Sequence, residues 1–198
     1  MPDNADQADD ENAIDLDLML KAKRGDIDAF ELLIERHQGA VIGTVSKMLN
    51  NSADAEDIAQ QVFIRLWKSA PKYEVKAKFT TFLFTITKNL VFNETSRRAR
   101  KKQVSLEERA EDSHLEIADE SYSKPDQNVL QAELQLAVDN AIQQLPEKQR
   151  LAVILRRYEQ LSYEEIADVL ELSVSAIKSQ LFRARTTLRE LLNNYLNE

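Results

Sequence analysis

The chain has 198 residues, of which 43% are hydrophobic, and its formal net charge is -8. This length allows one large or two small domains with packed cores, and we expect two small ones. The absence of cysteine excludes disulfides, a thiolate zinc site and redox sensing through the chain's own thiols. No apolar run approaches the roughly 20 residues of a membrane span, and the acidic start lacks signal-peptide character. A soluble cytoplasmic protein without membrane insertion is predicted.

Only three Gly and four Pro leave few turns of the kind that sheets need, which predicts an all-α fold. The charge divides the chain into four segments: 1–17 carries -7, 18–102 carries +7, 103–130 carries -6 and 131–198 carries -2. The two strongly acidic segments are poor in large apolar residues. They are predicted to be a disordered tail and a flexible linker that joins two small helical domains.

Four helices are expected between Leu16 and Lys102. The second is predicted to begin at Asp26 and to bury residues spaced by three and four: Phe30, Leu33, Ile34, His37, Val41 and Val45. The histidine is interpreted as a core or edge residue and not as a metal ligand. No second histidine or carboxylate stands at ligand spacing in the same helix.

A third helix is predicted with Asp54 as its N-cap, because three carboxylates in the first turn suit the helix dipole. Its buried stripe is Ile58, Val62 and Leu66. The opposite flank carries polar residues, namely Asp57, Gln60, Gln61 and Arg65. By itself this pattern is equally typical of a solvated helix face.

Aromatic and basic residues are interleaved along the next stretch. Seven of the thirteen aromatic residues lie between Phe63 and Phe92, and the segment from Arg65 to Lys102 holds eleven bases against two acids. Some rings must build the core, but exposed rings beside cations suit single-stranded nucleic acid. Cations follow the phosphates, and each stacked base contributes about 1–3 kcal/mol. The cluster Arg97–Lys102 alone is a weaker signal, since many helices end in bases.

The segment Ser162–Arg185 is typical of a helix-turn-helix. Ser162 and Glu165 form a capping-box pattern, which predicts a helix from Tyr163 that buries Ile166, Ala167 and Leu170. Glu171 falls in the tight turn, where a left-handed backbone is mildly strained for a residue other than glycine.

Ser173 is predicted to cap the second helix of this motif, whose buried stripe is Val174, Ile177, Leu181, Ala184 and Leu188. Its outward face carries hydroxyls, cations and one ring: Ser175, Lys178, Ser179, Phe182 and Arg183. Such a face suits the major groove, where these groups can reach base edges, phosphates and a thymine methyl. Two short helices with a polar face are also common in soluble proteins, and Phe182 could instead pack on the preceding helix.

Five segments in order resemble motifs of the extracytoplasmic-function (ECF) class of bacterial sigma factors, in the sigma-70 family. They are Gly25–Phe30, Asp54–Trp67, Lys78–Leu90, Leu145–Arg150 and the helix-turn-helix. The resemblance implies a promoter-specificity subunit with a region 2-like domain at 18–102 and a region 4-like domain at 131–198. Its implied partners are core RNA polymerase, through the clamp helices of the largest subunit and the flap region, promoter DNA, and an anti-sigma factor.

By position, the resemblance implies three sets of contact residues. The helix that grips the clamp helices matches Asp57, Gln60, Gln61, Arg65 and Trp67. The segment that melts the -10 element and holds a flipped base matches Tyr73, Phe79, Thr81, Phe82 and Asn89, with Arg97, Arg98 and Arg100 as phosphate contacts. The helix that reads the -35 element matches Ser175, Lys178, Ser179, Phe182 and Arg183.

Two other interpretations remain open at this point. An ordinary helix-turn-helix regulator, monomeric or dimeric, would bind duplex DNA without polymerase, but it leaves the basic aromatic segment unexplained. A helical adaptor that does not bind DNA has only the acidic segments in its favour. An enzyme is least favoured, because no Gly-rich phosphate loop, His-centred triad or metal-ligand cluster is present, and no cofactor is expected.

Overall fold

The computed structural model describes residues 4–50, 52–108 and 127–196. Its helices are α1 (Asn4–Ala22), α2 (Ile27–Leu49), α3 (Ser52–Ser69), the short 3-10 helix η1 (Ala70–Lys72), α4 (Phe79–Glu108), α5 (Gln127–Gln143), α6 (Glu147–Arg157), α7 (Tyr163–Leu170) and α8 (Val174–Leu196). These ranges contain no strand, so the predicted all-α fold is confirmed. No helix within them is long and apolar enough to cross a membrane.

Helices α1 to α4 form the first bundle, in which α2 packs against each of the other three. Asp26 caps α2 as predicted, since its carboxylate accepts a hydrogen bond from Ala29 N at 3.0 Å. The periodic apolar residues of the sequence make the core, which includes Leu33, Val41, Val45, Val62, Leu66, Leu83 and Val91. Each such side chain contributes about 1.5–3 kcal/mol when it is fully buried.

The acidic N-terminal segment differs from its sequence-based expectation. Residues 4–17 are helical and belong to α1, so the prediction of a disordered tail does not describe them. The reason is tertiary, because Met19 is fully buried in the core. In addition, the carboxylate of buried Asp15 accepts a hydrogen bond from Arg36 at 2.7 Å and lies 2.8 Å from His37 Nε2.

The start of α3 also differs from the prediction. Because the helix begins at Ser52, Asp54 lies inside the first turn and is not the N-cap. Its carboxylate still suits the positive end of the helix dipole, and it pairs with Arg98 of α4. The start of α4 is tied to α1, since Asn12 Oδ1 accepts a hydrogen bond from Phe79 N at 3.0 Å.

Helices α5 to α8 form the second bundle. Its buried residues come from all four helices and include Ile142, Leu151, Ile154, Leu155, Ile166, Val169, Ile177 and Ala184. Helix α8 packs against α5, α6 and α7, so it is the common support of this bundle.

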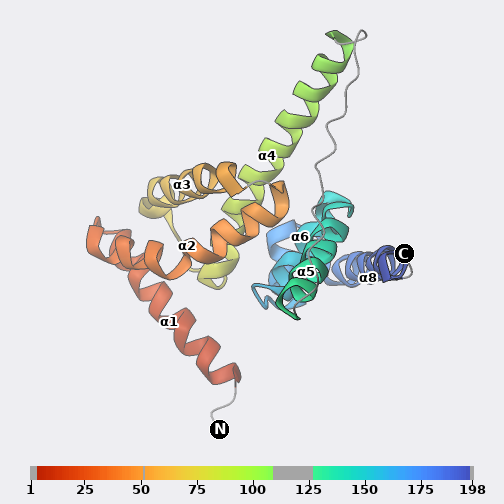
Figure 1. The fold of residues 1–198 in the computed structure, drawn as a ribbon. Coiled ribbons are helices and arrows are strands. Elements are labelled where there is room, and N and C mark those ends of the chain that lie inside the picture. The colour runs from red at the N-terminus through yellow and green to blue at the C-terminus, as the bar shows by residue number, and fades with distance from the viewer. Residues whose placement is uncertain (1–3, 51, 109–126, 197–198) are drawn as a thin grey trace.

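The two bundles touch each other. Helix α7 packs against α4, and α6 packs against α2. The buried apolar residues of both bundles form one continuous cluster. Figure 1 shows the far end of α4 projecting away from this body. In the predicted linker, residues 103–108 continue α4 and residues 127–130 begin α5, whereas residues 109–126 lie outside the described ranges.

We expect Asp15→Asn to lower the free energy of unfolding at neutral pH by about 1–3 kcal/mol, because it removes the buried carboxylate that pairs with Arg36 and His37. Asp17→Asn is the matched control on the same helix. Its ion pair with Lys21 is exposed, so the loss should stay below about 0.5 kcal/mol. Urea unfolding measures both.

The same comparison should depend on pH. Desolvation raises the pKa of Asp15, but hydrogen bonds from His37 and Arg36 outweigh it and hold the pKa below the usual 3.8. A depressed carboxyl pKa stabilises the fold above the unfolded value, and this contribution is lost as the pH falls through the folded value. The difference between wild type and Asp15→Asn should therefore shrink below about pH 4. A constant difference would contradict the ion-pair assignment.

Candidate nucleic-acid and protein interfaces

The helix-turn-helix is shaped by local capping. The backbone N of Glu165 donates to Ser162 Oγ at 3.1 Å, and the backbone N of Ser162 donates to the Glu165 carboxylate at 2.6 Å, which confirms the predicted capping box. Helix α7 ends at Leu170, and the next residue, Glu171, has a φ of 55°, as expected for this turn. Leu172 N then donates to Ala167 O at 3.0 Å, a bond that closes the C-terminus of the helix.

The recognition helix α8 starts as predicted, with Ala176 N donating to Ser173 Oγ at 3.2 Å. Its inward residues Ile177, Leu181 and Ala184 are buried. All five predicted outward residues are exposed, namely Ser175, Lys178, Ser179, Phe182 and Arg183. Because the Phe182 ring is 69% exposed, it does not pack on the preceding helix. The face thus presents two cations, two hydroxyls and a ring to solvent.

A second candidate surface is a hollow of about 340 Å³ at the start of α4. The rings of Tyr73 and Phe82, whose centroids are 5.0 Å apart, line it together with Thr81 and Thr85. Lys23 Nζ donates to the backbone oxygen of Tyr73 at 2.7 Å and so fixes this residue to the end of α1.

Two polar atoms of residues that line this hollow are buried and unsatisfied. Within the described ranges, the Tyr73 hydroxyl and Thr81 Oγ1 are buried and have no hydrogen-bond partner, and burial raises the pKa of Tyr73. A buried polar atom without a partner costs about 1–3 kcal/mol. The aromatic walls of the hollow suit a flat ring such as a nucleobase.

Asn89 extends the face of this hollow along α4, whereas Phe79 does not belong to it. Phe82, Thr85 and Asn89 are spaced by three and four residues, so they share one side of the helix, and Asn89 is exposed. Phe79 is fully buried, with its ring centroid 5.1 Å from that of His37. Its side chain is a core residue here and not part of a surface that could contact DNA.

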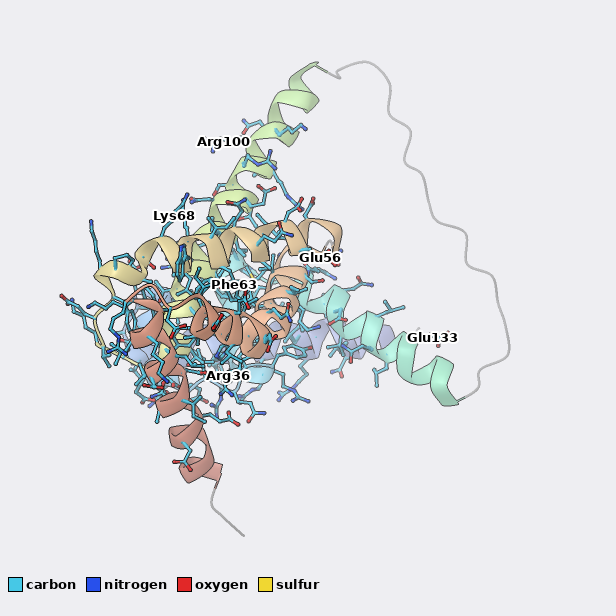
Figure 2. The ribbon with its side chains drawn as sticks, turned by 90° about the vertical axis from the view of Figure 1, so that its left-hand side faces the viewer. Arg36, Glu56, Phe63, Lys68, Arg100 and Glu133 are labelled. Atoms are coloured by element: carbon cyan, nitrogen blue, oxygen red, sulfur yellow. The ribbon has the colours of Figure 1, made fainter. Side chains whose placement is uncertain are left out.

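The three arginines predicted as phosphate contacts have different surroundings. Hydrogen bonds from Arg97 and Arg98 lower the pKa of Glu94 to about 2. Arg98 also pairs with Asp54, so it ties α4 to α3. Arg97 and Arg100 are exposed, and Figure 2 shows Arg100 on the projecting part of α4. These two are better placed than Arg98 to meet a phosphate.

The predicted polymerase contacts lie along α3. The residues of the predicted polar flank are all exposed, namely Asp57, Gln60, Gln61 and Arg65. Trp67 is partly buried and stacks on Phe30 of α2, with ring centroids 4.8 Å apart.

An apolar groove adjoins this flank and was not predicted. It measures about 550 Å³ and is lined by Ile27, Phe30, Ile34, Gln60, Phe63, Ile64, Trp67 and Lys68. Ile27 is 62% and Ile64 44% exposed. Figure 2 shows Phe63 between α3 and α2. The sequence could have indicated an apolar residue beside the polar flank, because Ile64 follows Gln60 by four residues and therefore lies on the same side of the helix.

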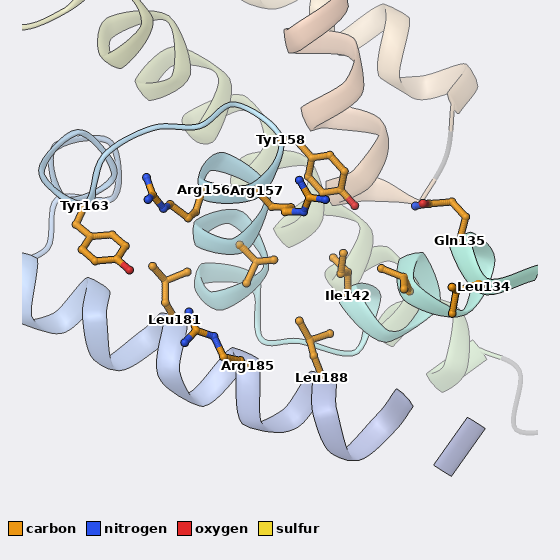
Figure 3. Close-up of a pocket in the computed structure, with 12 residues that line it drawn as sticks. Leu134, Gln135, Ile142, Arg156, Arg157, Tyr158, Tyr163, Leu181, Arg185 and Leu188 are labelled. Carbon is orange, nitrogen blue, oxygen red and sulfur yellow. The ribbon is translucent and has the colours of Figure 1, made fainter. Parts of the chain in front are cut away.

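A further groove of about 790 Å³ lies in the second bundle, between α5, α6 and α8 (Figure 3). Its apolar lining comes from Leu134, Val138, Ile142, Val153, Leu181 and Leu188. Three arginines also line it, and the Arg156 guanidinium lies 5.2 Å from the centre of the Tyr163 ring. No residue was predicted here, because the groove exists only where three helices meet. Its apolar floor and cations suit an amphipathic segment that carries acids.

These surfaces belong to an all-helical protein that carries an exposed helix-turn-helix face and a separate aromatic hollow. Residues 33–101 match the family described as Sigma-70 region 2, and residues 135–188 match Sigma-70, region 4. The RNA polymerase sigma-H factor of Pseudomonas aeruginosa is 33% identical over 187 residues, covering 93% of this chain and 96% of that protein. The chain belongs to the ECF class of the sigma-70 family.

Other relatives agree with this assignment. The ECF RNA polymerase sigma-E factor of Escherichia coli is 32% identical over 180 residues, covering 90% of this chain and 94% of that protein. A co-crystal structure of the sigma factor RpoE with the anti-sigma factor NepR from Bartonella quintana aligns with a TM-score of 0.64 and 26% identity. That alignment covers 83% of this chain and 96% of the other.

The core and surface rings should respond differently to truncation. We expect Phe79→Ala to lower the free energy of unfolding by about 3–5 kcal/mol, because it leaves a cavity under the first turn of α4. Phe182→Ala is the matched control, and its exposed ring should contribute less than about 0.5 kcal/mol. Denaturant unfolding followed by circular dichroism measures both. Equal losses of unfolding free energy in the two variants would contradict the assignment of Phe79 to the core and Phe182 to the surface.

Proposed function

We propose that this chain is an alternative sigma factor that binds core RNA polymerase, directs it to the -35 and -10 elements of its promoters, and promotes strand opening. The observation that carries the proposal is the pairing of two unlike nucleic-acid surfaces in one chain. An exposed recognition helix suits duplex DNA, and an aromatic hollow suits a base that has left the duplex. A simple helix-turn-helix regulator has no use for the second surface.

The -35 element is assigned to the outward face of α8. Lys178 and Arg183 supply cations for phosphates or guanine edges, and Ser175 and Ser179 supply hydroxyls. The exposed Phe182 ring can contact a thymine methyl. Each good base or phosphate contact contributes about 1–3 kcal/mol.

The -10 element is assigned to the hollow and its continuation on α4. A flipped base of the non-template strand would stack beside Tyr73 and Phe82 in the hollow. Asn89 lies on the same face and offers both a donor and an acceptor to the strand. Capture of one base offsets part of the few kcal/mol that unpairing costs, which favours the open duplex.

Core polymerase is assigned to two surfaces. The α3 flank and its apolar groove would meet the clamp helices of the largest subunit, and the groove between α5, α6 and α8 would take the flap region. An anti-sigma factor that competes for either groove is the third proposed partner. No catalytic role is assigned to this chain, since RNA synthesis belongs to the polymerase, and its place of action is the bacterial cytoplasm.

The clamp assignment predicts that Asp57→Ala combined with Gln61→Ala weakens the affinity for core polymerase by about ten-fold, because both exposed side chains would lie in the contact. Glu56→Ala is the control, since Glu56 is exposed on the same helix about 100° away. Titration against labelled polymerase, with thermal melting of each variant, measures the effect. Unchanged affinity in the double variant would remove the assignment.

The two DNA surfaces predict opposite responses to a premelted template. Asn89→Ala should leave closed-complex formation intact and slow strand opening, and a mismatched -10 region should reduce that defect. Lys178→Ala with Arg183→Ala should reduce initial binding on paired and mismatched templates alike, by about 1–3 kcal/mol per contact. Filter binding reports the first step, and permanganate footprinting of -10 thymines reports the second. Equal rescue of both variants would contradict this division.

A further inference from the structure

An irregular loop supplies much of the wall of the aromatic hollow. Residues 73–78 join η1 to α4, and four of them line the hollow, namely Tyr73, Glu74, Lys76 and Ala77. Residues 74–77 are all exposed, and no hydrogen bond joins them to another segment of the described chain. The interior of the loop therefore does not fix its own position, which depends on the two ends.

Both ends of this loop are held by bonds from the α1 segment. At the start, Lys23 Nζ donates to the backbone oxygen of Tyr73 at 2.7 Å, in a bond strengthened by the charge of the ammonium group. At the end, the backbone N of Phe79 donates to Asn12 Oδ1 at 3.0 Å. This second bond satisfies one of the four N–H groups that the first turn of a helix leaves without a partner.

Other contacts fix the backbone of the loop less firmly. The rings of Tyr73 and Phe79 are buried, but burial is non-directional and does not set the course of the main chain. Lys78 pairs with Glu165 at 3.5 Å through the end of a long, 40% exposed side chain, which constrains its backbone only weakly. The two bonds from Asn12 and Lys23 are therefore the directional constraints on the loop backbone.

One face of α1 carries both of these bonds. It follows a spacing of three and four residues, through Asn12, Asp15, Met19 and Lys23. Lys23 directly follows α1 and continues its last turn, since its backbone N donates to Met19 O at 2.9 Å. Met19 is fully buried, and the buried Asp15 carboxylate pairs with α2. The middle of this face is thus fixed to the core, while its two ends reach the loop.

We propose that Asn12 and Lys23 are positioning residues for the -10 element, because they hold the loop that forms one wall of the hollow. This role rests on the proposed function and adds two residues that act on DNA through the loop. Both lie outside residues 33–101, which match Sigma-70 region 2. Without these bonds the wall of the hollow is no longer fixed, so a flipped base is captured less selectively.

The mobility of the loop tests the positioning role in the free chain. Because the chain has no cysteine, Val75→Cys places a single nitroxide label on the loop, at a side chain that is 52% exposed. The electron paramagnetic resonance line should be broad in the wild-type background. Lys23→Met removes the donor and Asn12→Ala removes the acceptor. Each should narrow the line, and together they should shorten the rotational correlation time of the label by about two-fold.

The base preference of the holoenzyme tests the consequence for promoters. Core polymerase with each variant, without the label, transcribes a duplex library in which both the -35 and the -10 elements are randomised, and the transcribed templates are sequenced. In Lys23→Met and in Asn12→Ala, enrichment of the preferred base at the flipped -10 position should fall by about ten-fold. Enrichment at the -35 element should stay at its wild-type level, because α8 belongs to the other bundle.

Conservative variants and a matched control make these results specific. Lys23→Arg keeps a donor and Asn12→Asp keeps an acceptor, so both should retain the broad line and the -10 preference. Lys21→Met removes a cation that pairs with exposed Asp17 and not with the loop, so it should change neither. An unchanged line in both Lys23→Met and Asn12→Ala, or an equal loss of preference at the two elements, would overturn the positioning role.

The two measurements also separate this role from the proposed function. If the wild-type holoenzyme transcribes the library and both variants keep its -10 preference, the positioning role is wrong while the sigma function stands. If the wild-type chain does not bind core polymerase, the proposed function fails, and the line shapes of the free chain alone decide whether Asn12 and Lys23 hold the loop.

Discussion

Phe79 is fully buried at the first turn of α4, and its backbone N–H is capped by Asn12 from α1. Helices α1, α2, α3 and α7 all pack against α4, so the position of this one helix determines the others. It also divides the aromatic segment into core rings and surface rings. Phe79 is buried, whereas Phe82 and Thr85 are partly exposed and Asn89 is exposed along one side of the helix.

The two proposed nucleic-acid surfaces are built by different physical means. The helix-turn-helix depends on short-range bonds, since Ser162 caps α7, Ser173 caps α8 and the left-handed Glu171 sets the turn between them. Its outward face therefore follows from helical periodicity. The hollow beside Phe82 depends on distant segments, because Lys23 of the α1 turn holds the backbone of Tyr73. The first surface is prepared locally, whereas the second exists only in the folded bundle.

The uneven charge of the chain has a structural explanation. A net charge of -8 is unusual for a protein that binds DNA, but acids of the second bundle lie against the basic first bundle. Glu165 pairs with Lys78 and Glu171 pairs with Lys88 in this contact. Salt screens exposed ion pairs, while a buried ammonium group such as that of Lys88 is screened less.

The sequence by itself determined the all-α fold, the caps at Asp26, Ser162 and Ser173, and the exposed residues of α3 and α8, because capping and periodicity act over a few residues. Tertiary structure decided the remainder. Composition predicted a disordered tail, yet the burial of Asp15 with Arg36 and His37 holds α1 in the bundle. Spacing could not distinguish buried Phe79 from exposed Phe182, nor indicate that Glu171 would meet Lys88. Those outcomes depend on contacts between residues far apart in the chain, which local patterns do not encode.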